Sequence, residues 1–200
     1  MKAKQRLPEG YGKLFTVDLK NDKKAAAVVS VISLVIMVAL AVPMHFYVPI
    51  QTLFDMSSGM GAYAVRFLCL LVLMAAYMVV HELIHGITMK LYGTKKVKYG
   101  LTLMYAYAGS GDYYGKKSYL VIALAPVVLL GIVIGVVNAL VPVQWFWVVY
   151  MLQLCNLSGA AGDLYVTVRF MRLPADILIN DTGVTMTVYG KNNGDDSDEA

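Results

Sequence analysis

Long, almost uninterrupted apolar segments are the feature that most restricts how this chain can fold. Residues 25–42 contain only two serines among apolar residues, and a similar stretch runs from Phe67 to Val80. A helix needs roughly 20 apolar residues to cross a bilayer. Of the 200 residues, 58% are hydrophobic and 15% are charged, whereas soluble domains average about 45–50% and about 25%. The sequence therefore predicts a membrane protein and excludes a disordered chain, a nucleic-acid-binding protein and a secreted disulfide scaffold.

The apolar segments predict about four transmembrane helices, at residues 25–42, 61–92, 119–137 and 145–170. The second is longer than one membrane thickness, so this helix must tilt or one of its ends must protrude. We expect Pro126 to kink the third helix. Gly131 and Gly135 have the spacing of a helix-packing face, which also arises by chance in a helix rich in glycine. Trp145 and Trp147 lie where an interfacial aromatic belt is expected.

Two segments have the alternating pattern of β-strands rather than the periodicity of helices. Residues 97–107 alternate between larger apolar and smaller or polar side chains before a turn at 109–112, which indicates a hairpin or a single edge strand. Residues 177–179 and 184–189 flank a second turn and predict a small hairpin. The predicted fold class is an all-α polytopic membrane protein with a small β-hairpin or strand element near the cytosolic face.

Three parts are predicted along the chain: a basic cytosolic N-terminal segment at 1–24, a membrane domain at 25–172 and a cytosolic tail at 173–200 with an acidic end. Of the 17 Lys and Arg residues, seven precede the first span, six lie between the second and third, and three follow the fourth. Only Arg66 lies at the opposite side. Because basic residues concentrate on the cytosolic side of membrane proteins, we expect a multi-pass protein of the cell membrane with both termini in the cytosol.

Apart from basic residues near the span ends, four ionisable residues are the clear candidates inside the predicted spans: His81, Glu82, His85 and Asp163. A charged group inside a span costs at least about 2.5–3.5 kcal/mol, so each needs a reason to be there. His81 and His85 share one helix face, where both can bind one metal ion, and Glu82 completes the H-E-x-x-H pattern of zinc hydrolases with a general base. Asp163 is the expected third ligand, because it lies at nearly the same depth as His85. The alternative is that Asp163 caps a helix or pairs with a basic residue.

Other polar residues in or near the spans have less specific interpretations. Asn156 lies about two turns before Asp163 and either faces the site or makes a hydrogen bond between helices. His45, at the outer end of the first span, is interpreted as an interfacial residue. Cys69 and Cys155 lie in apolar runs and are interpreted as small buried side chains rather than a disulfide.

These motifs resemble the bacterial membrane family of zincin peptidases, which looks like a distant relative of the site-2 intramembrane metalloproteases. The resemblance rests on residues 81–86, on Lys96-Val97-Lys98-Tyr99-Gly100, on Gly162-Asp163-Leu164 and on Asp181-Thr182-Gly183. In site-2 proteases an Asn precedes Leu-Asp-Gly, whose Asp is the third zinc ligand. Here Asn156 precedes Asp163, with Gly and Leu exchanged around the Asp and without the usual prolines between them. The resemblance implies a peptidase in which Asp163 binds zinc and Asn156 has a substrate or oxyanion role.

The sequence thus predicts an intramembrane zinc metalloprotease. Zn²⁺ is held by His81, His85 and Asp163, Glu82 is the general base, and the substrate is a membrane-embedded or membrane-adjacent protein segment. The strand-like residues 97–107 either pair with that substrate or form a hairpin that covers the site. Two alternatives remain: a non-catalytic zinc-binding protein that regulates a partner, and a metal transporter. The expected partners are the lipid bilayer and such a protein or peptide substrate, and no nucleic acid. The sequence does not predict an oligomeric state.

Overall fold

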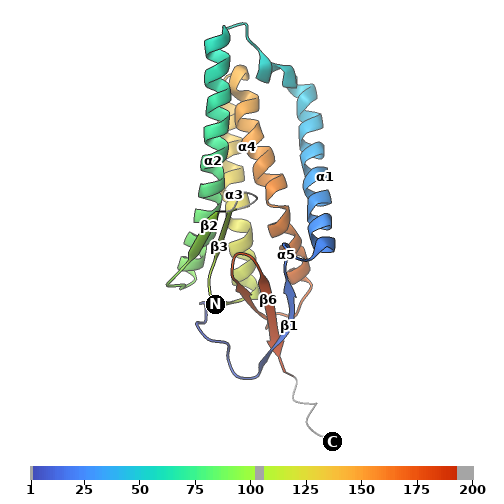
Figure 1. Ribbon diagram of the computed structural model, residues 1–200, viewed down its shortest axis with the longest axis vertical. Helices are drawn as coiled ribbons and strands as arrows, with labels where there is room; N and C mark the ends of the chain where they lie inside the picture. The colour runs from blue at the N-terminus through green and yellow to red at the C-terminus, as the bar shows by residue number, and fades with distance from the viewer. Residues whose placement is uncertain (1, 102–105, 193–200) are drawn as a thin grey trace, which may run out of the picture.

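The computed structural model describes residues 2–101 and 106–192, and it is mostly helical. Three long helices, α1 (Lys23–Tyr47), α2 (Met60–Leu91) and α3 (Lys116–Leu140), run along the length of the molecule (Figure 1). Two shorter helices, α4 (Phe146–Gly159) and α5 (Ala161–Met171), follow one another between them. A short 3-10 helix, η1 (Ile50–Phe54), links α1 to α2, and another, η2 (Val143–Trp145), precedes α4.

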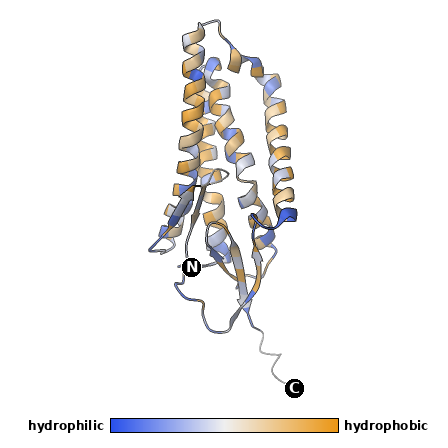
Figure 2. Ribbon diagram, in the orientation of Figure 1, coloured by the Kyte–Doolittle hydropathy of each residue, from blue (hydrophilic) through white to orange (hydrophobic). Residues whose placement is uncertain are grey.

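The three long helices are each long and apolar enough to cross a membrane. Their outward-facing side chains are mainly Val, Leu, Ile and Met, and many of these are more than half exposed. Figure 2 shows apolar residues along most of the helical part of the molecule. Exposing so many apolar side chains to water would cost free energy, whereas exposing them to lipid does not. These helices are therefore consistent with a membrane protein. Near the end of the long α2, Met89 packs into a core that includes strand residues.

The fourth apolar segment does not form the single long helix that was predicted at 145–170. It is divided at Ala160 into α4, of 14 residues, and α5, of 11 residues. Each is shorter than the roughly 20 residues that a span needs. Instead, α4 packs against α1, α2 and α3, and the Trp147 side chain is 1% exposed. Trp147 donates its Nε1–H to the Val48 carbonyl at 3.0 Å, so it belongs to the core and not to a lipid-facing aromatic belt.

Strands from distant parts of the chain form a four-stranded antiparallel sheet at one end of the bundle (Figure 1). Its order is β1 (Tyr11–Val17), β6 (Met186–Lys191), β5 (Leu178–Asp181) and β4 (Tyr113–Gly115). The predicted hairpin of the tail is confirmed, because β5 and β6 pair with Asp181 opposite Met186. The basic N-terminal segment also contributes, because β1 pairs with β6.

A second, two-stranded sheet pairs β2 (Lys98–Leu101) with β3 (Ala106–Gly109). The alternating pattern at 97–107 therefore folds back on itself, and the connection at 102–105 lies outside the described residues. The hairpin lies close to α2 at Gly86, where any side chain would collide with the Tyr99 ring. The strands thus lie beside the part of α2 that carries the ionisable residues.

A buried cluster joins the sheet to the helices below the ionisable residues. It contains Met89 of α2, Ile122 of α3, Phe170 of α5 and Ile179 of β5. Phe170 and Ile179 are fully buried. Since such apolar contacts fix the relative positions of the elements that make them, this cluster sets how α2, α3 and α5 meet.

Candidate metal centre

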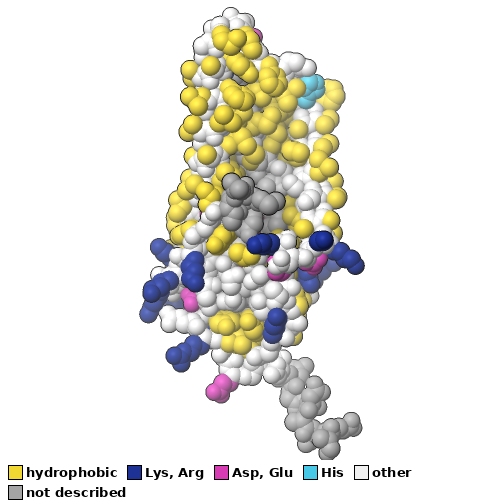
Figure 3. Space-filling view, in the orientation of Figure 1, with side chains coloured by type: hydrophobic (Ala, Val, Ile, Leu, Met, Phe, Trp, Pro, Cys, Tyr) yellow, Lys and Arg dark blue, Asp and Glu magenta, His cyan; other side chains and the backbone are white. Residues whose placement is uncertain are grey.

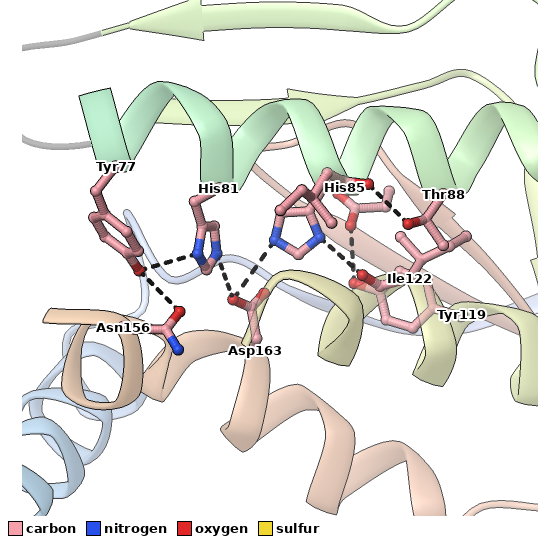
Figure 4. Close-up of polar contacts among 10 residues, drawn as sticks. Tyr77, His81, His85, Thr88, Tyr119, Ile122, Asn156 and Asp163 are labelled. Atoms are coloured by element: carbon pink, nitrogen blue, oxygen red, sulfur yellow. Dashed lines mark hydrogen bonds and ion pairs between the residues drawn. The ribbon is translucent and has the colours of Figure 1, made fainter. Parts of the chain in front are cut away.

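The two histidines of the H-E-x-x-H motif lie on one face of α2, one turn apart. The centroids of the His81 and His85 rings are 5.0 Å apart, and each residue is 8% exposed. This face of α2 is directed toward α3 and α5 (Figure 4). The four-residue spacing therefore places two imidazoles at one buried point, as predicted.

Asp163 reaches the same point from the first turn of α5. Its Oδ2 atom lies 3.5 Å from His81 Nε2 and 3.7 Å from His85 Nε2. The break at Ala160 makes Asp163 part of a helix N-terminus, where the backbone dipole favours a negative charge. The prediction that Asp163 lies at the depth of the histidines is confirmed by these distances.

The three side chains bring their donor atoms close enough together to form a group that could hold one metal ion. Zinc takes His nitrogen and carboxylate oxygen atoms at about 2.0–2.2 Å in tetrahedral sites, so two of its ligands lie roughly 3.3 Å apart. One ligand atom from each of the three residues lies within 4.8 Å of the others. The donor set of two imidazoles and one carboxylate is the type used at catalytic zinc sites with an open position.

Both histidines have partners for their second ring nitrogen. His85 Nδ1 lies 2.9 Å from the Ile122 carbonyl of α3. His81 Nδ1 lies 3.0 Å from the hydroxyl of Tyr77, which precedes it by one turn on α2. Outer contacts of this kind fix the orientation of metal-binding histidines. Tyr77 was not identified from the sequence, although its position four residues before His81 on an apolar helix was a usable signal.

Glu82 lines a cavity of about 610 Å³, and His81, His85 and Asp163 line the same cavity. Ala108 of β3 forms part of the same wall, as does Cys155 of α4. Neither Cys69 nor Cys155 forms a disulfide. The cavity gives a substrate-sized space beside the three convergent side chains.

The Asp181-Thr182-Gly183 turn forms another part of the cavity wall. Asp181 Oδ2 accepts a hydrogen bond from the Tyr119 hydroxyl at 2.9 Å, and Oδ1 accepts one from the Gly183 N–H at 2.7 Å. Burial raises the pKa of the Asp181 carboxyl to about 6, although these two hydrogen bonds oppose the change. Gly183 has φ = +85°, and a side chain there would meet Tyr107 and Ala108 of β3. The turn therefore fastens the tail to the hairpin next to the cavity.

Asn156 lies behind the cavity and is fully buried. Its Nδ2 donates to the Val127 carbonyl of α3 at 2.9 Å, and its Oδ1 accepts from the Tyr77 hydroxyl at 3.4 Å. Of the two interpretations of Asn156, the structure shows the hydrogen bond between helices. His45 is far from these residues along α1, where its Nδ1 accepts from the Ile50 N–H at 3.1 Å.

The chain belongs to the family described as "Putative zincin peptidase", which residues 73–178 match. The matched region covers more than half of the chain and contains the H-E-x-x-H motif and Asp163. The family's description implies a zinc metallopeptidase.

One curated relative is an uncharacterized 24.7 kDa protein from Pyrococcus woesei, which is 29% identical over 118 residues. The match covers 54% of this chain and 49% of the relative, so the chain spans about half the length of that protein. No solved structure matches the chain.

Proposed function

We propose that this protein is an intramembrane zinc metallopeptidase. The observation that carries the proposal is the convergence of His81, His85 and Asp163, from two separate helices, on one point in the wall of a cavity that Glu82 also lines. A structural zinc site is usually closed by four protein ligands. Three ligands beside a cavity of about 610 Å³ leave a coordination position open for water and substrate.

A zinc ion held by His81, His85 and Asp163 would lower the pKa of a bound water to about 7 and polarise a peptide carbonyl. Glu82 accepts a proton from the water as its oxygen bonds to the carbonyl carbon, and then donates that proton to the amine as the C–N bond breaks. His81 and His85 remain neutral ligands, and Asp163 balances part of the metal's charge. The half-buried Glu82 is adjacent in sequence to the first ligand, as this role requires.

The site lies close to one membrane face in the proposed arrangement. At about 1.5 Å per residue, His81 is roughly 32 Å along α2 from Met60, which is about the thickness of the hydrocarbon core. Figure 3 shows Lys and Arg side chains gathered around the sheet end of the molecule and not along the apolar helices. By the positive-inside rule this end faces the cytosol, with both termini on that side.

The substrate class follows from this position. A bond that reaches the cavity belongs to a membrane-embedded or membrane-adjacent protein segment. Because helical carbonyls are already hydrogen-bonded, the segment must be locally unwound before it can react. The combination of H-E-x-x-H with a distant Asp in apolar helices is the basis of the proposed likeness to site-2 proteases.

The proposal is tested by Glu82→Gln in purified protein reconstituted into liposomes. Single-span reporter proteins, with helix-breaking residues near the cytosolic end of the span, serve as substrates. We expect one zinc ion per wild-type chain, cleavage of at least one reporter, and at least about a 100-fold loss of cleavage in the variant with zinc retained. Glu9→Gln, at an exposed position, is the matched control.

Two results would contradict the proposal. A wild-type chain that binds no zinc would exclude the metal site. Zinc binding with equal cleavage by wild type and Glu82→Gln would exclude the mechanism, and full cellular function of this variant would favour a non-catalytic zinc protein.

A further inference from the structure

The backbone of α3 supplies an unusual acceptor to the metal centre because of Pro126. In an α-helix the N–H of residue 126 would bond to the carbonyl of residue 122, but proline has no N–H. Pro126 lies inside α3 and is buried. The Ile122 carbonyl that it leaves without this helical partner is the one that His85 Nδ1 contacts at 2.9 Å. Since a carbonyl can only accept, Nδ1 of His85 carries a proton, and Nε2, on the side of Asp163, is the nitrogen left to bind a metal ion.

A second α3 carbonyl fixes the orientation of Asn156. The Val127 carbonyl lies 2.9 Å from Asn156 Nδ2, and because it cannot donate, the amide nitrogen must face it. The Asn156 oxygen is therefore directed to Tyr77 (Figure 4). Gly131 makes room for this arrangement, since a side chain there would approach Asn156 Nδ2 to 3.3 Å.

The orientation of Asn156 in turn determines the proton of His81. The Asn156 oxygen can only accept, so the single hydroxyl proton of Tyr77 is donated to it. The Tyr77 oxygen then has only acceptor capacity left for His81 Nδ1, 3.0 Å away. His81 therefore donates from Nδ1, and Nε2, on the side of Asp163, is the nitrogen left to bind a metal ion. Two backbone carbonyls of α3 thus set the same tautomer in both histidines by independent routes.

We propose that Tyr77, Asn156 and Pro126 are positioning residues, which hold both histidines with the proton on Nδ1 and both Nε2 atoms ready for one metal ion. This inference rests on the proposed zinc site and deepens it. It assigns Asn156 to the orientation of a ligand and not to substrate. It also gives Pro126 a chemical role, the release of the Ile122 carbonyl, in addition to any bend in α3.

Zinc affinity of the detergent-solubilised protein, measured by competition with a chromophoric chelator, tests the Tyr77 route. Tyr77→Phe removes the hydroxyl that His81 Nδ1 contacts and is expected to weaken zinc binding about 10- to 100-fold, as is typical of outer contacts to metal ligands. Tyr150→Phe is the matched control, because Tyr150 donates to the Leu40 carbonyl between α4 and α1, away from the centre. Equal zinc affinity in wild type and both variants would overturn the role of Tyr77.

Pro126→Ala separates the positioning role from helix stability, because the substitution should not lower the unfolding temperature but should lower the zinc affinity. Alanine is the better helix former, so the zinc-free variant is expected to unfold at the same or a higher temperature. The restored N–H competes for the Ile122 carbonyl, so zinc affinity is expected to fall several-fold. A variant that keeps wild-type zinc affinity would overturn the role of Pro126.

Imidazole ¹⁵N NMR of the zinc-loaded protein gives a readout that a general structural defect does not move. The chain has three histidines, and His45 serves as an internal reference. In wild type we expect Nδ1–H signals for both His81 and His85. Tyr77→Phe should perturb His81 alone and Pro126→Ala should perturb His85 alone, and equal perturbation of both by either variant would overturn the proposal.

The proposed function and this inference fail in different ways. Absence of zinc in wild type, or unchanged zinc affinity in His81→Ala, contradicts the metal centre itself. Normal zinc binding that His81→Ala abolishes and Tyr77→Phe and Pro126→Ala leave intact contradicts only the positioning roles.

Discussion

At the end of the bundle where η1 joins α1 to α2, the buried charge is Arg66, which is 4% exposed. Its guanidinium donates to the backbone carbonyls of Asp55 and Gln144. At the sheet end, the charged group is Asp163, and its neighbours are two titratable imidazoles beside a cavity. Backbone carbonyls compensate Arg66, together with a coulombic contribution from the Asp55 carboxylate, and the structure brings no histidine to this charge among the described residues. The comparison shows that a charge in an apolar helix bundle can join loops or create chemistry, depending on its partners.

The largest expected effect is the loss of zinc affinity when the Asp163 carboxylate is removed. Asp163→Ala leaves two ligands and a buried pair of imidazoles, so zinc affinity should fall by more than the 10–100-fold typical of outer contacts. Metal analysis of the purified variant and wild type measures this. Arg66→Met, at the other end, should retain wild-type zinc content, and loss of zinc in both variants would remove the distinction between the two ends.

The stability of the sheet end should also depend on pH, because Asp181 is buried there with a raised pKa. Its folded pKa of about 6 exceeds the unfolded value of 3.8, so the folded state binds the proton more tightly. The resulting stability is present below about pH 4 and is lost as the pH rises to about 6, by up to about 3 kcal/mol. Thermal unfolding from pH 4 to 7 should show this loss in wild type relative to Asp181→Asn. Parallel pH profiles of the two proteins would contradict it.

Arg66→Met should reduce stability without a dependence on metal. Two backbone carbonyls lose a charged donor, and hydrogen bonds to charged groups contribute about 1.5–3 kcal/mol each at most. We expect the midpoint of chemical unfolding to fall by the same amount with zinc and with a chelator. A change that appears only in the zinc-loaded protein would show that the two ends are coupled.

The smallest effect is expected from two glycines on α3. Gly135→Ala meets no atom within 4 Å and should stabilise the helix by roughly 0.5–1 kcal/mol. Gly131→Ala crowds Asn156 and should lose this gain, with a few-fold decrease in zinc affinity. Identical zinc affinities in the two variants would show that the carbonyl-to-Asn156 contact tolerates displacement.

The candidate site was predictable from sequence where its residues are close along one helix. His81 and His85 are related by helical periodicity alone, and Asp163 followed from equal depth in two apolar segments. Tyr77 and Asn156 are linked through hydrogen bonds between α2, α3 and α4, and Pro126 acts through the Ile122 carbonyl that it leaves without a helical partner. No periodicity encodes such contacts, because they depend on the rotation of each helix against its neighbours.

The fold differed from expectation where tertiary packing overrides local pattern. The apolar character of 145–170 outweighed the Ser158-Gly159 pair, a turn signal that directly precedes the break at Ala160, and this break gives Asp163 its place near a helix N-terminus. The four-stranded sheet was foreseen only in its β5–β6 hairpin. β4 has three residues, and β1 lies in a basic segment, so neither has a pattern that specifies its partner. The order of these strands is fixed by the burial of Tyr114, Ile179 and Val188.

The sheet has a consequence for biosynthesis. The N-terminal strand β1 pairs with β6, which is made after every helix. It therefore has to wait for its partner until the ribosome has produced the whole bundle. The Asp181 turn, which completes the cavity wall, is made in the same late stage. During synthesis the helices that carry the candidate metal ligands are thus present before the turn that forms part of the cavity wall beside them.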